Sequence, residues 1–198
     1  MSVCLLAISD GRHAYHQASL QSALERLPRF DAHVFVDDPD HRLGFDGAVR
    51  EGWRRALQAG CDHVFHLELD FTFRRPIPVD RMIAVLDDHP YLAQIALVRQ
   101  PWNAAERAAG GLAAYLSDDL RRVEDRGDRW MEHRRYFTTN PSVYPAWVAR
   151  RGWPAGAESE GRFGVELFRS HPDLCSALWG TGEEWVTHIG DERAGKGY

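Results

Sequence analysis

Two carboxylates stand two positions apart in the segment "HLELDF", residues 66–71, where Glu68 and Asp70 follow an apolar run. Residues two apart on a β-strand point to the same side of the strand. Two like charges there repel each other unless a positive group lies between them. Carboxylate oxygens suit Mg²⁺ and Mn²⁺, hard ions that also bind the phosphate oxygens of a substrate. The pair therefore predicts a divalent-metal site, with two solvated acids as the alternative.

Two more polar clusters follow apolar runs. In "FVDDPD", Asp37 and Asp38 could accept hydrogen bonds from a ribose or a base, although an Asp-Pro turn explains the same residues. In "ISDGR", Ser9, Asp10 and Gly11 follow the first apolar run, where a backbone can approach a ligand closely. The glycine patterns of a Walker A loop and of a dinucleotide fold are both missing, so a glycine loop that cradles phosphate is not predicted.

Apolar runs alternate with helical stripes through the first half of the chain, with short connections between them. This pattern predicts an α/β fold with a Rossmann-like, mostly parallel central sheet, helices on both faces and a single domain. Ligands bind beyond the carboxyl ends of the strands in such sheets, which is where the three clusters fall. Segments after about residue 100 are expected to be irregular and partly helical and to cover that edge. The expected strands are 3–8, 32–36, 63–73 and 91–98, the first two buried, and the expected helices are 14–27, 45–60 and 79–90.

The composition is that of an ordinary globular protein, with 44% hydrophobic and 27% charged residues. No apolar run approaches the roughly 20 residues of a membrane helix, and the first residues lack the pattern of a signal peptide. A net charge of −5 does not favour a dedicated nucleic-acid-binding protein. Cys4, Cys61 and Cys175 are scattered and odd in number, which predicts reduced thiols in a cytoplasmic protein.

The order of these features resembles the nucleotide-sugar-binding half of GT-A fold glycosyltransferases. A strand that ends in a short polar loop is followed by a strand that ends in Asp-Asp, and "HRLGFDGAVREGWRRALQAGCDHVFHLELDF" then leads through a helix to the paired acids. The resemblance covers residues 1 to about 100 well and the remainder more loosely. Within this fold the chain resembles the small stand-alone, family 2-like enzymes of actinobacteria and their bacteriophages, which share "QPWNAAERAAGG", "HRRYFTTNP" and the terminal "GKGY".

The resemblance implies a transferase that moves a sugar from a nucleoside-diphosphate sugar, with a UDP-sugar favoured, to an acceptor hydroxyl with inversion. Glu68 and Asp70 then take the place of the Asp-x-Asp motif that binds Mn²⁺ or Mg²⁺, with Asp70 the preferred ligand. Glu in the first place and Leu69 in the middle depart from the family pattern. His188 matches a late metal ligand, although without the family it would be a core histidine. Glu160 matches the general base, with its neighbour Glu158 as the alternative.

The resemblance also implies contacts to the donor and acceptor. Residues 1–100 would form the nucleotide-sugar half and residues 101–198 the acceptor half. For Arg193 and Lys196 in the tail, the alternative is that they are solvated surface charges. For Trp102, the alternative is a packing role. The expected nucleoside and diphosphate contacts are Ser9, Asp10, Gly11, Asp37, Asp38, Asp46, Gly47, Arg193 and Lys196, and the expected sugar or acceptor contacts are Trp102, Asn103 and Asn140.

Three other functions compete with this hypothesis. A sugar nucleotidyltransferase would need a glycine-rich basic loop after the first strand, which "SDGRHAYHQ" does not supply. A non-catalytic nucleotide- or carbohydrate-binding module is favoured only by Leu69. A carboxylate-metal hydrolase would need Asp37, Glu68 and Asp70 to converge. The acceptor is left open among a modified DNA base, a protein and a glycan, with no membrane partner expected and the host cytoplasm as the location if a phage encodes the chain.

Overall fold

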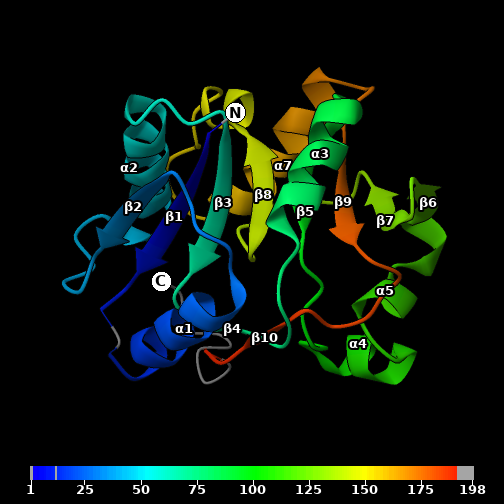
Figure 1. The fold of residues 1–198 in the computed structure, drawn as a ribbon, viewed down its shortest axis with the longest axis horizontal. Helices are drawn as coiled ribbons and strands as arrows, with labels where there is room; N and C mark the ends of the chain where they lie inside the picture. The colour runs from blue at the N-terminus through cyan, green and yellow to red at the C-terminus, as the bar shows by residue number, and fades with distance from the viewer. Residues whose placement is uncertain (1, 12, 191–198) are drawn as a thin grey trace.

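An eight-stranded sheet forms the centre of the computed structural model, which describes residues 2–11 and 13–190 (Figure 1). Its strand order is β2-β1-β3-β8-β5-β9-β7-β6. A second sheet pairs β4 with β10 in antiparallel fashion, just beyond the carboxyl ends of β1 and β3. The strands are β1 (Val3–Ser9), β2 (Ala32–Asp37), β3 (His63–Glu68), β4 (Phe71–Phe73), β5 (Leu92–Ala96), β6 (Arg121–Asp125), β7 (Asp128–His133), β8 (Ser142–Pro145), β9 (Cys175–Trp179) and β10 (Val186–His188).

The central sheet is mostly parallel, as predicted. β1 pairs in parallel with β2 and β3, and β5 pairs in parallel with β9. β8 lies antiparallel between β3 and β5, while β7 is antiparallel to both β9 and β6. Only β8 and β7 therefore oppose the common direction. Strands from the two halves of the sequence interleave, so the expectation of irregular, partly helical structure was wrong for residues 129–147, where β7 and β8 lie. Helices do form at Ala104–Ala109 and Ser159–Ser170, and β10 lies within the segment 185–190, where the sequence predicts a short strand or turn.

Helices cover both faces of the sheet, as predicted, because alternate residues of each strand point to opposite sides. On one face Trp53 of α2 and Phe163 of α7 pack against each other in a core cluster that also includes Leu6 of β1. On the other face Met82 of α3 packs in a cluster with Phe65 of β3. The helices are α1 (His13–Arg26), α2 (Gly44–Gln58), α3 (Val79–Asp88), α4 (Ala104–Ala109), α5 (Leu112–Tyr115), α6 (Ala146–Ala149), α7 (Ser159–Ser170) and the 3₁₀ helix η1 (Ser117–Asp119).

β2 lies at the edge of the sheet rather than inside it, so the expectation of a fully buried strand was wrong. Val34 and Val36 face the core, whereas the Phe35 side chain is 43% exposed. β1 is the neighbour of β2 in the sheet, and no other strand among the described residues pairs with β2. The short apolar run "AHVFV" did not distinguish an edge strand from an inner one.

The expected continuous strand 63–73 is interrupted at the carboxylate pair. β3 ends at Glu68, and Leu69 and Asp70 form a turn into β4. Leu69 donates its backbone N–H to the carbonyl of Ile8 at 2.8 Å, and its side chain is buried in the core. Glu68 therefore ends the strand and Asp70 lies in the turn that follows, so the two acids do not share one face of a strand. Leu69, which departs from the family motif, fills a core position.

Cys4 and Cys61 are joined by a disulfide, so the expectation of three reduced thiols was wrong. Cys4 lies in β1 and Cys61 just before β3, the strand beside it, and their Cα atoms are 5.8 Å apart, within the usual disulfide range. Cys175 is free and buried. In the described ranges, no helix combines the length and the apolar character that crossing a bilayer requires.

Candidate functional site

Two adjoining cavities lie at the carboxyl ends of β1 and β3, where Ile8 is in register with Glu68. A small cavity of about 30 Å³ and a large cavity of about 530 Å³ both have Glu68 and Phe45 in their walls. The strand ends therefore bring together residues that the sequence analysis took from separate segments. The small cavity includes the predicted residues Ser9, Asp10, Glu68 and Asp70, and the large one includes Glu68, Trp102, Asn140, Glu160 and His188.

Asp70 and His188 form a buried pair although 118 positions separate them in the sequence. His188 Nε2 lies 3.1 Å from Asp70 Oδ2, because β10 pairs with β4 immediately after the Asp70 turn. The N–H of Ile189 also donates to the Asp70 carbonyl at 2.7 Å. A Cβ at Gly190 would lie 2.7 Å from Asp70 Oδ2, so only glycine lets the backbone pass so close to the pair.

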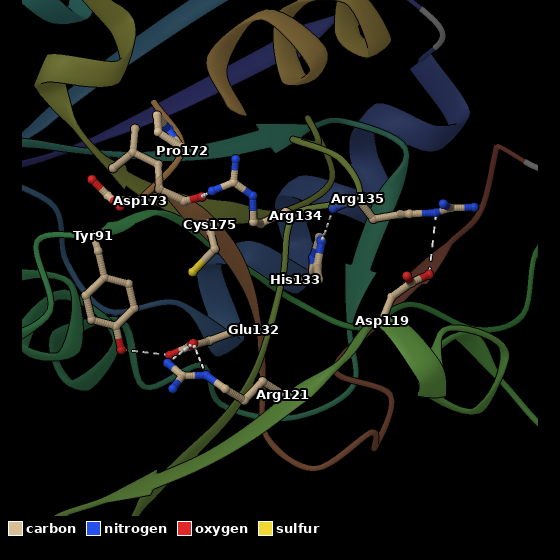
Figure 2. A pocket seen from close by; sticks show the side chains of 11 residues that line it. Tyr91, Asp119, Arg121, Glu132, His133, Arg134, Arg135, Pro172, Asp173 and Cys175 are labelled. Carbon is tan, nitrogen blue, oxygen red and sulfur yellow. Dashed lines mark hydrogen bonds and ion pairs between the residues drawn. The ribbon is translucent and has the colours of Figure 1, made fainter. Parts of the chain in front are cut away.

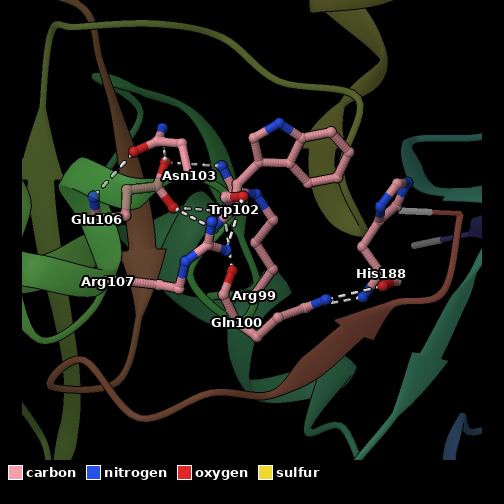
Figure 3. A network of polar contacts seen from close by, with 7 residues as sticks. All are labelled: Arg99, Gln100, Trp102, Asn103, Glu106, Arg107 and His188. Carbon is pink, nitrogen blue, oxygen red and sulfur yellow. Dashed lines mark hydrogen bonds and ion pairs between the residues drawn. The ribbon is translucent and has the colours of Figure 1, made fainter. Parts of the chain in front are cut away.

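Aromatic side chains and one glutamine fix the position of His188. Its ring lies between those of Phe71 and Trp102, with a centroid distance of 4.6 Å to each. The Gln100 side chain accepts the His188 N–H at 2.8 Å and donates to the His188 carbonyl at 2.7 Å (Figure 3). Both the backbone and the ring of His188 are therefore restrained before any ligand binds.

The donor atoms of this pair fit a divalent ion. Two ligand atoms at about 2.1 Å from one ion and at right angles to each other are about 3.0 Å apart, close to the 3.1 Å between Asp70 Oδ2 and His188 Nε2. Oε1 of Glu68 is buried beside them without a hydrogen-bond partner. Within residues 2–11 and 13–190, no three His, Cys, Asp or Glu side chains gather as a metal-binding group, and Mg²⁺ is commonly held by one or two carboxylates together with substrate phosphates.

The pKa of Glu68 is raised well above its ordinary value. Burial is the main cause, and the negative charges of Asp70 and Glu160 add to it, while a hydrogen bond from Thr139 opposes them. The structure therefore gathers three carboxylates, whose mutual repulsion a cation would relieve.

We expect Glu68→Gln to stabilise the metal-free protein at pH 8 by about 1 kcal/mol, because the substitution removes a buried carboxyl group whose ionisation the native state disfavours. With its pKa raised, Glu68 holds its proton in the native state above the pH at which it ionises in the unfolded chain. The free energy of unfolding therefore falls as the pH rises from the pKa of Glu68 in the unfolded chain to its raised pKa in the native state. Urea unfolding in EDTA at pH 5 and pH 8 tests this, with the exposed Glu158→Gln as control. An equal pH dependence in wild type and Glu68→Gln would contradict it.

Glu160 enters the large cavity from the first turn of α7. Its Oε1 accepts hydrogen bonds from Thr139 N at 2.6 Å and Thr139 Oγ1 at 2.9 Å. The neighbouring loop is held by Gln94 of β5, whose Oε1 accepts the N–H of Thr138 at 3.0 Å. Glu158 is exposed and precedes the helix, outside the lining of the cavity. Of the two candidate bases, Glu160 is the one beside the other carboxylates.

Several predicted nucleoside contacts lie outside both cavities. Asp38 is buried and accepts the backbone N–H groups of residues 42–44 at 2.8–3.0 Å, so it shapes the turn into α2. Asp37 is exposed at the edge strand. Asp46 accepts the N–H of Gly156 at 2.9 Å, and this bond is the main cause of its lowered pKa. Two more predicted positions outside the cavities are Gly11, which packs against Pro39, and Gly47, which packs against Leu43. The predicted contacts Arg193 and Lys196 lie outside the described residues.

Asn103 caps α4 instead of lining the cavity. Its Oδ1 accepts the N–H of Glu106 at 2.9 Å, and its Nδ2 donates to Glu106 Oε1 at 3.1 Å. We expect Asn103→Ala to lower the free energy of unfolding by about 1 kcal/mol, whereas Asn103→Ser, which keeps a capping oxygen, should retain most of it. Urea unfolding measures both, and equal losses would contradict the capping role.

Four residues that organise the site are not predicted from the sequence: Arg99, Gln100, Glu106 and Thr139. Arg99 and Glu106 form a partly buried ion pair with Nη1–Oε2 at 2.7 Å. The one local signal was Asn103 followed three positions later by Glu106, the spacing of a helix-capping box. The other contacts join residues that are distant in the sequence and leave no local pattern.

No protein-family model matches the chain, and a search of curated proteins finds no match to its sequence. The fold is similar to that of solved structures of TarS from S. aureus. For TarS 1-349 the TM-score is 0.61 at 12% identity, covering 97% of this chain and 61% of that one. Its complex with UDP gives 0.59 at 12% identity over 94% and 60% of the two chains, and its complex with UDP-GlcNAc gives 0.59 at 12% over 96% and 61%.

The likeness to TarS concerns the fold, because the identity is only 12%. This chain spans about three fifths of the length of the TarS 1-349 structures. A large, mostly parallel sheet flanked by helices is common to both. The chain therefore has a mixed α/β fold like that of TarS.

Proposed function

We propose that the chain is a metal-dependent glycosyltransferase that moves a sugar from a nucleoside-diphosphate sugar to an acceptor hydroxyl with inversion. The observation that carries the proposal is the buried Asp70–His188 pair beside a cavity of about 530 Å³ that also holds Glu160. The fold supports it, because TarS structures of the same fold contain UDP and UDP-GlcNAc. A UDP-sugar is accordingly the favoured donor.

The donor side uses residues of both cavities. Asp70 and His188 would hold Mn²⁺ or Mg²⁺, with Glu68 next to them. When held there, such an ion would supply positive charge to stabilise the departing diphosphate. Ser9 and Asp10, in the small cavity beside Asp70, would contact the nucleoside.

Glu160 is the proposed general base. Thr139 directs two hydrogen bonds to Oε1 and so fixes the orientation of the carboxylate. We assign Oε2 to take the proton of the acceptor hydroxyl as that oxygen attacks the anomeric carbon. Trp102 and Asn140 line the same cavity and would contact the transferred sugar or the acceptor. Asp37, exposed at the sheet edge, lies apart from Glu68 and Asp70, so a hydrolase built on those three acids is not favoured.

Thermal unfolding with a panel of UDP- and GDP-sugars, each with and without Mn²⁺, tests the donor assignment. We expect a UDP-sugar to raise the melting temperature when Mn²⁺ is present, because binding to the native state stabilises it. UDP-GlcNAc belongs in the panel because it is bound in a TarS structure. If no nucleotide or sugar nucleotide shifts the transition with Mn²⁺, the proposed function is wrong.

A further inference from the structure

Glu106 is a buried carboxylate outside the proposed catalytic groups, with charge-assisted hydrogen bonds on both oxygens. Oε2 accepts Arg99 Nη1 at 2.7 Å and the Trp102 N–H at 2.7 Å. Oε1 accepts Arg99 Nη2 and Asn103 Nδ2, each at 3.1 Å. Burial opposes its ionisation, but the Arg99 guanidinium and the Trp102 N–H hold the pKa of Glu106 below its ordinary value. The carboxylate therefore ties together both ends of the segment 99–103 (Figure 3).

Segment 99–102 lies against β10 and contacts His188 at two places. Arg99 bridges to Val186 at the start of β10, and Gln100 binds both backbone groups of His188. Trp102 lies against the His188 ring, and the Arg99 guanidinium is 5.5 Å from the Trp102 ring centroid. Since Glu106 binds Arg99 and Trp102 directly, it fixes the two residues on either side of the Gln100 contact.

We infer that Glu106 is a positioning residue for the Asp70–His188 pair. It holds segment 99–102 so that Gln100 and Trp102 keep the His188 ring close enough to Asp70 for both side chains to bind the same ion. The inference rests on the proposed function, because it takes His188 as an ion ligand. Groups that orient a metal-binding histidine commonly change metal affinity by about 10- to 100-fold when they are removed. Glu106 would act on His188 through Gln100 and Trp102 rather than by contacting the nucleotide-sugar donor.

The alternative is that Glu106 serves only to stabilise the fold around α4. A second carboxylate in this chain provides a matched control. Glu132 is 4% exposed, as Glu106 is, and it accepts hydrogen bonds from Arg121 and Tyr91 (Figure 2). The Trp130 indole N–H also donates to it. It lines a separate cavity whose walls contain none of the proposed catalytic residues. Glu132→Gln and Glu106→Gln should therefore cost similar thermal stability but differ in their effect on the metal pair.

The experiment measures Mn²⁺ affinity in the presence of UDP by calorimetry or EPR. We expect Glu106→Gln to weaken it about 10- to 100-fold and Glu132→Gln to leave it unchanged. Trp102 is 36% exposed, and Trp102→Ala keeps the hydrogen bonds of Glu106 to Arg99, to Asn103 and to the backbone N–H of residue 102. This variant should also weaken Mn²⁺ binding. The double variant Glu106→Gln/Trp102→Ala should lose less than the sum of the two, because both act on His188.

A second readout needs no metal. The ring protons of His188, assigned with a His188→Gln variant, should move in the NMR spectrum of Glu106→Gln because the ring current of Trp102 is displaced, and should stay in place in Glu132→Gln. Unchanged Mn²⁺ affinity and unchanged His188 signals in Glu106→Gln would overturn the inference and leave the proposed function standing. If the wild type binds no Mn²⁺ with UDP, the proposed function itself fails and takes the inference with it.

Discussion

Asp70→Asn is expected to abolish donor turnover, with a loss of about 10²- to 10⁴-fold. The substitution keeps the size of the side chain but removes the charge that lies 3.1 Å from His188 Nε2. A metal ion that stabilises a leaving group contributes several kcal/mol, and each 1.4 kcal/mol is about a factor of ten in rate. The measurement is release of UDP from a UDP-sugar in the presence of Mn²⁺.

Asp87→Asn is the matched control for Asp70→Asn. Asp87 pairs with His63 through Nε2–Oδ1 at 3.2 Å, at the opposite end of the strand that leads to Asp70. Both variants remove a carboxylate from an Asp–His pair, but only one of the pairs lies at the cavities. We expect Asp87→Asn to retain activity. Turnover that survives in Asp70→Asn would remove the metal role from this motif.

The second large effect is expected for Glu160→Gln, which should lower turnover by about 10²- to 10⁴-fold, the usual contribution of a general base. Glutamine can still accept the hydrogen bonds from Thr139, so the loop and the cavity should keep their shape. Donor affinity, measured by calorimetry with UDP and Mn²⁺, should therefore change little. The loss should appear in kcat and not in donor binding.

Glu158→Gln separates the two acids that the sequence left as alternatives. Glu158 is exposed and does not line the cavity, so its substitution should leave both turnover and donor affinity unchanged. If Glu160→Gln instead loses donor binding, Glu160 belongs to the donor site and is not the base. Equal losses in the two variants would place the base elsewhere.

The α/β architecture could be predicted from the sequence because its signals are local. Apolar runs such as "VCLLAI" and helical stripes such as that of α2 alternate along the first half of the chain. The carboxyl ends of parallel strands share one edge, so the positions of Ser9 and Glu68 followed from the fold class alone. The short strands of the second half could not be recognised in the same way. β6, "RRVED", is polar and mostly exposed, and β8 has only four residues.

The site depends on contacts that no local pattern encodes. The proximity of His188 to Asp70 was expected from a family resemblance, and it arises in the structure from the pairing of β10 with β4. In the sequence Glu106 is one acid in the alanine-rich segment "NAAERAAGG", and its proposed role depends on a tertiary contact with Arg99. The disulfide of Cys4 and Cys61 likewise follows from two strands lying side by side, which the spacing of the cysteines does not reveal.

We propose above that Asp70 and His188 bind a divalent ion that carries a nucleoside diphosphate. The most direct measurement is an anomalous difference map from crystals grown with Mn²⁺ and UDP. We expect one strong peak within about 2.0–2.6 Å of both Asp70 Oδ2 and His188 Nε2, a range typical of hard divalent ions and their ligands, with diphosphate oxygens as further ligands. UDP bound in the cavities without a peak at this pair, or a peak elsewhere in the protein, would contradict it.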